Sequence, residues 1–525
     1  MNLLVEENQL IVKHVLQNLC DSGIEEIVIC PGGRNAPFVS ALDQTSFFKV
    51  WYWSEERSAA FFAIGRIKAT NKPVAIITTS GSAVAELFPA VMESFYSNLP
   101  LLCLTADRPK EMRGTGAPQT VNQYNIFGVY TPFFKDVEEE EFTLKDWDLT
   151  KPAHLNICLS EPLELDFEPF KINIAKVEKP KKKYLYSLEI EKFFERNSYP
   201  FVIVSHIPFS AIHSVCQFLK NLKAPLYLEA SSQLREHPDL QQFRIHFSEN
   251  LLEEALANQY PIDSILRIGG VPTLKFWRVL NKLKGKFDLL SIDVKEFPGI
   301  TWGNHIQYAL DRLHEIQIST FFDFTNWSKR NLENVNFLYQ LMKEEPLAEP
   351  SLIHSLSKKI AEQSIVYLGN SLPIREWDGF ANSLYKNSTY YSSRGVNGID
   401  GQLSTFLGLT NPLKNNWGIF GDLTVLYDMA APWIIKQLPE TIFSLAIINN
   451  GGGKIFERMH ASKSMLNSHD YQFEQFAKMW NLSYEKCNCL PNTLACGKPH
   501  VLEIIPDNDS TTIFWKKWLA FIKQN

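Results

Sequence analysis

The chain has 525 residues, a formal net charge of −6 and 21% charged residues. This length exceeds what one hydrophobic core usually supports, so we expect two to four domains. The net negative charge argues against a general role in binding nucleic acid or a membrane surface. We find no signal-peptide pattern and no apolar run of about 18 residues, so we expect a cytoplasmic protein without a transmembrane helix.

Most of the eight cysteines are scattered along the chain, several of them inside apolar runs. This pattern is typical of reduced thiols in the cytosol. The group Cys487, Cys489, Cys496 and His500 could indicate a metal site. However, Cys-x-Cys is not the usual spacing of zinc ligands, so we expect these residues to be bystanders.

Apolar strand patterns alternate with helical patterns from the N-terminus onward. In the first third of the chain, the strand-like runs EEIVICPGG, KPVAIITTSG and LPLLCLTADRP are separated by the helical patterns AAFFAIGRIKAT and AVAELFPAVMESFY. Continuous apolar strands of this kind are typical of a parallel sheet that is covered by helices on both faces.

The same alternation recurs twice more along the chain. The basic run VEKPKKKYLY at residues 177–186 predicts a linker, and LMKEEPLAEP at residues 341–350 predicts a second break. We therefore predict an α/β protein with three domains, each with a mostly parallel sheet flanked by helices. Their predicted limits are residues 1–180, 181–345 and 346–525.

Two glutamates, Glu55 and Glu56, lie between the aromatic run WYW and the apolar run AAFFAIG. Glutamate is almost never fully buried unless it is paired. A carboxylate at the junction of an apolar strand and an apolar helix therefore needs either a partner or a function.

The most specific motif lies in the third predicted domain. One apolar strand, WGIF, ends in Gly421-Asp422, and the next, FSLAII, ends in Asn449-Asn450. A right-handed crossover places the two strand ends side by side, at the edge where open α/β sheets bind ligands. Carboxylate and amide oxygens suit Mg²⁺, with part of its octahedron left for phosphate oxygens and water. The glycines after Asn450 allow a diphosphate to approach the backbone closely.

Simpler interpretations of these glycine-rich stretches fit less well. Either dipeptide alone could be an ordinary turn at the end of a strand, but the pair at this separation favours a metal site. The run GGGKI is not a phosphate-binding P-loop, because Ile455 replaces Ser or Thr and the earlier glycine is missing. RGTGAPQ lacks the third glycine of a dinucleotide fingerprint, which argues against a nucleotide-binding dehydrogenase.

Gly-Asp followed by Asn-Asn at this separation resembles the signature of the thiamine-diphosphate-dependent enzymes. The resemblance implies thiamine diphosphate as cofactor, with Mg²⁺ or Mn²⁺ held by Asp422, Asn450 and the backbone of Gly452. It implies that Ile399 props the cofactor into its bent, reactive shape. Further cofactor contacts implied by the match are Gly395, Asn397, Gly398, Asp400, Gly421, Leu423, Gly453, Ile455 and Phe456. Leu423 departs from the Gly or Ala of many members, at a position that is not a ligand.

In that family, a glutamate of the first domain shares a proton with the pyrimidine ring of the cofactor. The match gives this catalytic role to Glu56 and leaves Glu55 a structural one. We expect the apolar surroundings of Glu56 to raise its pKa. The resemblance also implies pyrimidine-binding, central and diphosphate-binding domains, in that order. It implies a homodimer or homotetramer with active sites at the dimer interface.

Several stretches are most similar to the branch of the family that serves menaquinone biosynthesis: PGGRNAP, SEERSAAFFAIG, TSGSAVAELFPA, LTADRP with GAPQ, GNSLPIR, SSRGVNGIDG and GDLTVLYD. The resemblance implies a transferase that decarboxylates 2-oxoglutarate and adds the succinic-semialdehyde carbanion equivalent to isochorismate. Both substrates carry carboxylates, which arginine binds well through its planar fork.

The match assigns the carboxylate-binding positions residue by residue. Ser371, Arg375 and Arg394 would hold the carboxylate that derives from oxoglutarate. The residues that would face isochorismate are Arg34, Arg108, Gln119 and Asn370. Lys275 is a further candidate, although Phe276 follows it where some members have Arg. Gly33 and Asn35 replace residues that are usually serine in the first turn.

Two alternatives stay open. The chain could be another thiamine-diphosphate decarboxylase or carboligase, which would act on small or neutral acceptors and would not need the arginines. It could also be a catalytically inactive scaffold of the same fold, although the retained Glu56, Asp422 and Asn450 argue against this.

Overall fold

The computed structural model describes residues 2–138, 142–174, 188–246, 251–257, 260–273, 276–316, 318, 324–457, 462–494 and 497–524. The chain forms two compact units, which we call unit 1 and unit 2 and describe separately. Unit 1 consists of Met1–Lys181, Ser393–Leu413 and Leu423–Thr441. Unit 2 consists of Lys182–Ser392, Lys414–Asp422 and Ile442–Asn525.

Unit 1 contains a 6-stranded parallel sheet in the order β2-β1-β3-β4-β6-β5. Its strands are β1 (Glu26–Ile29), β2 (Lys49–Tyr52), β3 (Val74–Thr78), β4 (Leu101–Asp107), β5 (Phe133–Val137) and β6 (Ala153–Cys158). Its helices are α1 (Asn2–Asp21), α2 (Ala36–Asp43), α3 (Glu56–Thr70), α4 (Ser82–Glu86), α5 (Phe88–Ser97), α13 (Gln402–Leu409) and α14 (Asp422–Tyr427), whose first residue belongs to unit 2. Short 3₁₀ helices are η1 (Lys110–Met112), η2 (Gly128–Tyr130) and η7 (Ala431–Gln437).

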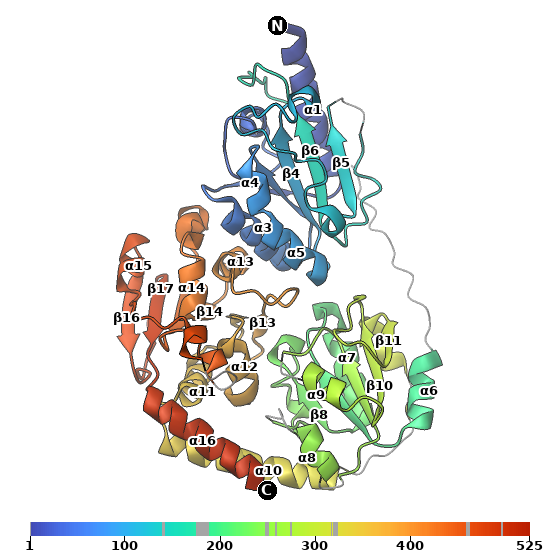
Figure 1. Ribbon diagram of the computed structural model, residues 1–525, viewed down its shortest axis with the longest axis vertical. Helices are drawn as coiled ribbons and strands as arrows, with labels where there is room; N and C mark the ends of the chain where they lie inside the picture. Colours follow the sequence, from blue (N-terminus) through green and yellow to red (C-terminus); the bar gives the residue numbers. More distant parts are fainter. Residues whose placement is uncertain are drawn as a thin grey trace. The chain divides into compact units, whose positions relative to one another are not determined.

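Helices cover both faces of this sheet, which explains why its strands are apolar on both sides (Figure 1). Residues of α1 and α2 share one core with Ile27 and Ile77, while α3 packs on the opposite face. Helix α3 also packs closely on α13. A Cβ atom on Gly65 would lie 2.2 Å from the backbone oxygen of Thr405, so glycine is needed for this approach.

The first sheet of unit 2 has 5 parallel strands in the order β11-β10-β9-β7-β8. The strands are β7 (Pro200–Val204), β8 (Leu226–Leu228), β9 (Ser264–Ile268), β10 (Asp288–Asp293) and β11 (Asn304–Gln307). Around them lie α6 (Leu188–Arg196), α7 (Ile212–Leu222), α8 (Leu251–Ala257), α9 (Phe276–Lys282) and α10 (Thr325–Glu344), with η3 (Phe209–Ala211), η4 (Ala230–Ser232), η5 (Pro238–Leu240) and η6 (Leu310–Glu315). Separate apolar cores cover its two faces.

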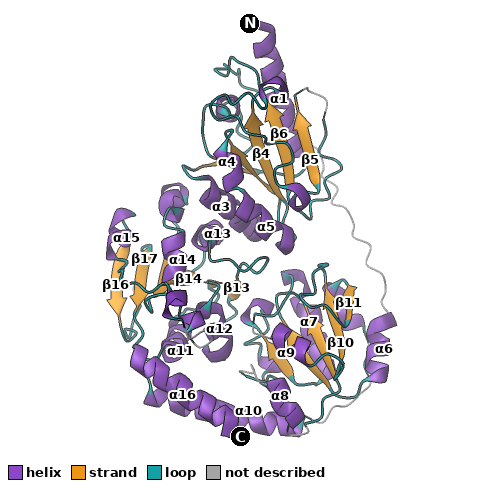
Figure 2. Ribbon diagram, in the orientation of Figure 1, coloured by secondary structure: helices purple, strands orange, loops and turns teal. Residues whose placement is uncertain are grey.

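The second sheet of unit 2 has 6 parallel strands in the order β13-β12-β14-β15-β17-β16. The strands are β12 (Ile365–Leu368), β13 (Thr389–Tyr391), β14 (Asn416–Gly421), β15 (Phe443–Ile448), β16 (Ser483–Cys487) and β17 (His500–Ile504). The helices are α11 (Glu349–Lys359), α12 (Leu372–Phe380), α15 (Glu474–Met479) and α16 (Asn508–Gln524), with η8 (Lys454–Phe456) and η9 (Lys463–Leu466). Apolar residues of α11 and α12 cover one face of this sheet (Figure 2).

The predicted fold class is confirmed, because all three sheets are parallel and flanked by helices. Each sheet lies within one of the three predicted domain ranges, whose limits stay a prediction. The predicted linker at 177–186 lies outside the described residues, and the predicted break at 341–350 contains the connection between α10 and α11. In the described part of the chain, no helix combines the length and apolar character needed to cross a membrane.

Candidate active site

The carboxyl ends of β14 and β15 bring together Asp422 and the turn at residues 449–453. The two strands are parallel, with Gly421 paired to Ile448, so the residues that follow them meet at one edge of the sheet. Asp422 is 2% exposed, and its Oδ2 accepts hydrogen bonds from the backbone nitrogens of Gly451 and Gly452, each at 2.9 Å. The arrangement predicted for Gly-Asp and Asn-Asn is therefore present.

The two asparagines of this turn have different surroundings. The amide nitrogen of Asn449 donates to the backbone oxygen of Tyr471 at 2.8 Å and to Glu503 Oε1 at 2.6 Å. Glu503 is fully buried in β17, so Asn449 ties the end of β15 to its neighbouring strand. The amide nitrogen of Asn450 instead donates to both carboxylate oxygens of Glu349, at 3.1 and 3.0 Å.

The amide oxygen of Asn450 is the most informative atom of the site. It is buried, and among the described residues it has no hydrogen-bond partner. Buried acceptors nearly always have a partner, so this oxygen is open to a water molecule or a bound ion. Asn450 Oδ1 and the Asp422 carboxylate are oxygen donors, which is the chemistry that Mg²⁺ or Mn²⁺ prefers.

The backbone of the turn at residues 449–453 allows a bound group to approach it closely. Gly451 and Gly452 both have positive φ, at 80° and 136°. A Cβ atom on Gly452 would lie 2.5 Å from the backbone oxygen of Leu466, so only glycine fits. The carbonyl of Gly452, predicted as the third metal ligand, accepts a hydrogen bond from the nitrogen of Lys454 at 2.9 Å and keeps a second lone pair. These features fit a bound cation and a diphosphate group.

Glu55 and Glu56 have different surroundings at the start of α3 in unit 1. The Glu55 carboxylate caps the helix by accepting from the nitrogens of Arg57 at 3.0 Å and Ser58 at 2.9 Å. Its structural role was predicted. Glu56 is half-buried, and its pKa is raised, first by burial and then by the charges of Glu55 and Glu86. This direction agrees with the expectation for Glu56.

The Arg57 side chain contacts Tyr427 and Glu55. Its guanidinium donates to the backbone oxygen of Tyr427 at 3.1 Å and lies 5.0 Å from the centre of that ring. Its Nε lies 3.8 Å from Glu55 Oε1. Arg57 therefore partly neutralises Glu55.

A loop of unit 1 at residues 394–401 carries Arg394 and several of the predicted cofactor contacts. Its backbone is held by Glu93 of α5, whose carboxylate accepts from the nitrogens of Gly395 at 2.9 Å and Val396 at 2.8 Å. Glu93 is 2% exposed, so this contact is shielded from water. In the same loop, burial raises the pKa of Asp400.

Three predicted substrate residues meet at the carboxyl edge of the unit 1 sheet. Arg34 follows β1 and is 7% exposed, with its guanidinium donating to Glu161 Oε1 at 2.9 Å and to the Leu159 backbone oxygen at 3.3 Å. Arg108 follows β4 and donates to the backbone oxygen of Gln119 at 3.1 Å. Burial lowers the pKa of Arg34, which Glu161 opposes and Arg108 reinforces. Two cations thus share this edge and favour an anionic ligand.

In unit 2, Asn370, Ser371 and Arg375 lie at the start of α12. Asn370 is 1% exposed, and Arg375 donates to the backbone oxygen of Ser371 at 2.5 Å. Ser371 has φ 71° and ψ −128°, close to the φ 89° and ψ −141° of Gly81 before α4. This conformation costs a residue with a side chain about 1–3 kcal/mol, and such strain often marks a functional position.

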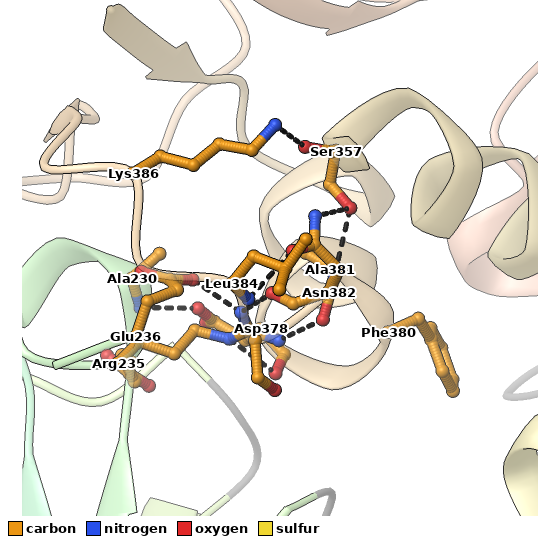
Figure 3. A network of polar contacts seen from close by, with 12 residues as sticks. Ala230, Arg235, Glu236, Ser357, Asp378, Phe380, Ala381, Asn382, Leu384 and Lys386 are labelled. Carbon is orange, nitrogen blue, oxygen red and sulfur yellow. Dashed lines mark hydrogen bonds and ion pairs between the residues drawn. The ribbon is translucent and has the colours of Figure 1, made fainter. Parts of the chain in front are cut away.

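A buried arginine fixes the other end of α12 (Figure 3). Arg235 is fully buried and donates to three backbone oxygens at the end of this helix: Asp378 at 3.1 Å, Ala381 at 2.7 Å and Asn382 at 3.1 Å. The Asp378 carboxylate in turn accepts from the nitrogen of Ala230 at 2.8 Å. These bonds join the two sheets of unit 2 and hold the helix that carries Ser371 and Arg375.

The predicted site residues are distributed over both units. Those in unit 1 are Arg34, Glu56, Arg108, Gln119, Arg394, Gly395, Asn397, Gly398, Ile399, Asp400 and Leu423. Those in unit 2 are Asn370, Ser371, Arg375, Gly421, Asp422, Asn450, Gly452, Gly453, Ile455 and Phe456. Lys275 lies outside the described residues.

The cysteine group near the C-terminus shows no metal geometry in its described part. Cys496 lies outside the described residues, and His500 Nδ1 lies 3.0 Å from Ser444 Oγ. Within the described ranges, no three or more His, Cys, Asp and Glu side chains are grouped so as to hold a metal ion.

Three residues that support the predicted site residues were not predicted from the sequence: Glu93, Glu349 and Arg235. Each is buried and acts on the backbone or side chain of a predicted residue that is distant in sequence. Among the three, only Glu93 gives a sequence signal, a carboxylate within an apolar helical pattern.

Known proteins resemble the chain over nearly its whole length. The protein family described as "Thiamine pyrophosphate enzyme, N-terminal TPP binding domain" matches residues 11–126. A 2-succinyl-5-enolpyruvyl-6-hydroxy-3-cyclohexene-1-carboxylate synthase of Bdellovibrio bacteriovorus is 40% identical, over 97% of this chain and 98% of the relative. An enzyme of the same name from Akkermansia muciniphila is 34% identical, over 95% and 96% of the two chains.

A solved structure resembles the chain as well. It is described as a candidate thiamin diphosphate-dependent enzyme from Mycobacterium smegmatis. The match has a TM-score of 0.69 and 14% identity, and it covers 94% of this chain and 99% of the other. At this identity the likeness shows the fold alone.

Proposed function

The chain belongs to the 2-succinyl-5-enolpyruvyl-6-hydroxy-3-cyclohexene-1-carboxylate synthase family of thiamine-diphosphate-dependent enzymes, and from that premise we propose that it joins 2-oxoglutarate to isochorismate with loss of CO₂. The product would be the compound that names the family, an intermediate of menaquinone biosynthesis. The observation that carries the proposal is the buried, unpartnered Asn450 oxygen beside Asp422.

The edge at β14 and β15 would hold the cation and the diphosphate group. Asp422, Asn450 and the Gly452 carbonyl would bind Mg²⁺ or Mn²⁺, and the glycine turn would admit the phosphate oxygens close to the backbone. Thiamine diphosphate, when bound, supplies the carbanion stabilisation that decarboxylation of a 2-oxo acid needs.

Glu56 would hold and share a proton at its carboxyl group beside the pyrimidine ring of the cofactor. Its half-buried position and raised pKa support this role, because the protonated form is then populated at higher pH than in water. The Glu55 cap fixes the first turn of α3, so the Glu56 backbone is held where the helix begins.

The arginines would supply the recognition of the two acids. Arg34 and Arg108, with Gln119 and Asn370, would face isochorismate. Ser371, Arg375 and Arg394 would hold the carboxylate derived from oxoglutarate, and Lys275 is a further candidate. The charge repulsion between Arg34 and Arg108 supports this assignment, because an anion between them would relieve it.

The wider organisation follows from the same premise. Residues 1–180 would form the pyrimidine-binding domain, 181–345 the central domain and 346–525 the diphosphate-binding domain, in a homodimer or homotetramer whose interface contains the active sites. The described cysteines are all free thiols, which supports a cytoplasmic location.

The test is a reconstituted reaction with a panel of substrates. Purified protein is supplied with thiamine diphosphate, Mg²⁺, 2-oxoglutarate and isochorismate, and the products are identified by mass spectrometry. We expect one adduct whose mass equals both substrates less CO₂, and no adduct when any component is omitted. Turnover of pyruvate without this adduct would identify a different thiamine-diphosphate carboligase, and absence of cofactor binding would identify an inactive scaffold.

A further inference from the structure

Glu349 pairs with Asn450, one of the proposed ligands of the cation. We propose that Glu349 is a positioning residue that dictates which end of the Asn450 carboxamide faces the divalent cation. This inference rests on the proposed function, because it assumes a cation beside Asp422 and Asn450. It assigns a role in metal affinity to a residue that would not itself touch the metal.

The geometry of the pair is specific. Both carboxylate oxygens of Glu349 accept from Asn450 Nδ2, at 3.1 and 3.0 Å. Glu349 is 3% exposed and is the first residue of α11. Its backbone nitrogen donates to Thr511 Oγ1 of α16 at 3.0 Å, which fixes the start of the helix. The backbone that carries the carboxylate is therefore fixed at the start of α11.

A carboxamide needs such an anchor because its two ends are nearly the same shape. Oxygen accepts hydrogen bonds and nitrogen donates them, so a half-turn of the group exchanges a ligand atom for a group that repels a cation. An ionised carboxylate only accepts, and in the flipped orientation Asn450 Oδ1 would face it with no hydrogen between them. Glu349 thus favours the orientation of the Asn450 carboxamide in which Oδ1 is available to the cation.

Asn449, the adjacent residue, forms a similar pair with a buried glutamate but is not a proposed metal ligand. Asn449 also donates to a buried carboxylate, that of Glu503. The second oxygen of Glu503 accepts from the nitrogen of Phe473 at 3.0 Å and from the hydroxyl of Tyr484 at 2.6 Å. Both carboxylate oxygens of Glu503 thus have protein partners, whereas the pair at Asn450 leaves the buried amide oxygen of Asn450 without a partner among the described residues.

Glu349 would also act through its charge. The buried Glu349 carboxylate, bonded to the amide nitrogen of Asn450, would polarise this amide. It would also place negative charge on the side of Asn450 that is opposite to its free oxygen. Partners of this kind, which bind the ligand rather than the metal, typically change metal affinity about 10–100-fold.

The test measures metal affinity directly. Binding of Mn²⁺ is titrated by electron paramagnetic resonance in the presence of saturating thiamine diphosphate. We expect Glu349→Gln to weaken Mn²⁺ binding about 10–100-fold, because either orientation of Asn450 then finds a complementary partner. The matched control, Glu503→Gln, should lower thermal stability and leave Mn²⁺ affinity within about twofold of the wild type.

A double variant distinguishes orientation from a loss of folding. Asn450→Asp alone places a carboxylate against Glu349 and should weaken Mn²⁺ binding, because like charges repel. Combined with Glu349→Gln, the introduced amide can donate to the introduced carboxylate, and Mn²⁺ binding should recover relative to Asn450→Asp alone. Glu349→Asp keeps an acceptor and should retain more affinity than Glu349→Gln. A merely structural role of Glu349 would not produce this order of affinities.

The outcomes separate the inference from the proposed function. If the wild type binds Mn²⁺ and Asn450→Ala does not, while Glu349→Gln and the double variant bind like their parents, the positioning role is refuted and the proposed function stands. If the wild type binds no Mn²⁺ in the presence of the cofactor, both are refuted. In the supported case, excess Mg²⁺ should also restore the turnover of Glu349→Gln.

Discussion

Two sheet edges of this protein have the same topology and opposite chemistry. At the carboxyl edge of the unit 1 sheet, Arg34 and Arg108 lie close enough that the charge of Arg108 adds to burial in lowering the pKa of Arg34. At the corresponding edge of the second unit 2 sheet, Asp422 and the Asn450 oxygen are presented instead. The difference teaches that parallel topology decides where a ligand binds, while the residues after each strand decide its charge.

The two edges also differ in whether their polar atoms already have hydrogen-bond partners. The guanidinium of Arg34 already contacts Glu161 and a backbone oxygen. The oxygen of Asn450 has no partner among the described residues. We therefore expect the first edge to exchange existing contacts for a substrate, and the second to be completed by a bound ion.

The largest effect is expected at Glu56, which follows β2 at the carboxyl edge of the unit 1 sheet. Glu56→Gln removes the shared proton while keeping the size of the side chain. Turnover should fall about 10²–10⁴-fold, the usual worth of general acid–base help. Steady-state kinetics measure the loss, and calorimetry should still detect thiamine diphosphate. An unchanged rate would remove Glu56 from the chemistry, and Glu55→Gln serves as the neighbouring comparison.

Arg34→Met should weaken recognition of isochorismate at the same edge. A hydrogen bond to a charged group contributes about 1.5–3 kcal/mol, so kcat/KM for isochorismate should fall roughly 10–150-fold. The control is Arg66→Met. Arg66 pairs with Glu26 at 2.7 Å, at the start of β1 and thus at the opposite end of the sheet. That variant should lower stability and leave the KM for isochorismate unchanged. Equal losses in both variants would contradict a substrate role for Arg34.

Asn449→Ala tests the difference between the two asparagines that follow β15. It leaves the buried Glu503 carboxylate and the Tyr471 backbone oxygen without this donor, which should cost about 1–3 kcal/mol of unfolding free energy. Urea denaturation measures the cost. Mn²⁺ affinity should stay near the wild-type value, in contrast to Asn450→Ala. A loss of Mn²⁺ binding in Asn449→Ala would mean that both asparagines serve the metal.

The smallest effect is a pH dependence that comes from Glu56. Because its folded-state pKa is raised, chiefly by burial, its favourable contribution is complete below the unfolded pKa of about 4.3. That contribution is lost as pH rises through the folded pKa. Denaturation of cofactor-free protein should therefore show equal stabilities of wild type and Glu56→Gln near pH 4, with a growing advantage of the variant toward neutral pH. A difference that is constant with pH would contradict the raised pKa.

The fold could be predicted because its signals are local. Apolar strand runs such as FSLAII and their alternation with helical patterns fix the sheet type, and Gly421-Asp422 and Asn449-Asn450 mark two strand ends. The structural role of Glu55, which the family resemblance implied, agrees with its position as the N-cap of α3.

The supporting residues could not be predicted, because their contacts depend on long-range packing. Glu349 is 101 residues from Asn450, and Glu93 is 302 residues from Gly395. Nothing in the sequence near Arg235 indicates that it binds three carbonyls at the end of α12. Such pairings follow from the packing of elements, and one sequence contains no signal for them.

The most direct test of the account is a labelled reaction that counts both products. With 2-oxoglutarate labelled at its C1 carboxylate, we expect labelled CO₂ and the isochorismate adduct to form in equal amounts. Both should require thiamine diphosphate and a divalent cation, and both should be lost in Asp422→Ala. Release of CO₂ without adduct, or adduct formation that persists in Asp422→Ala with the cation removed by a chelator, would contradict the account.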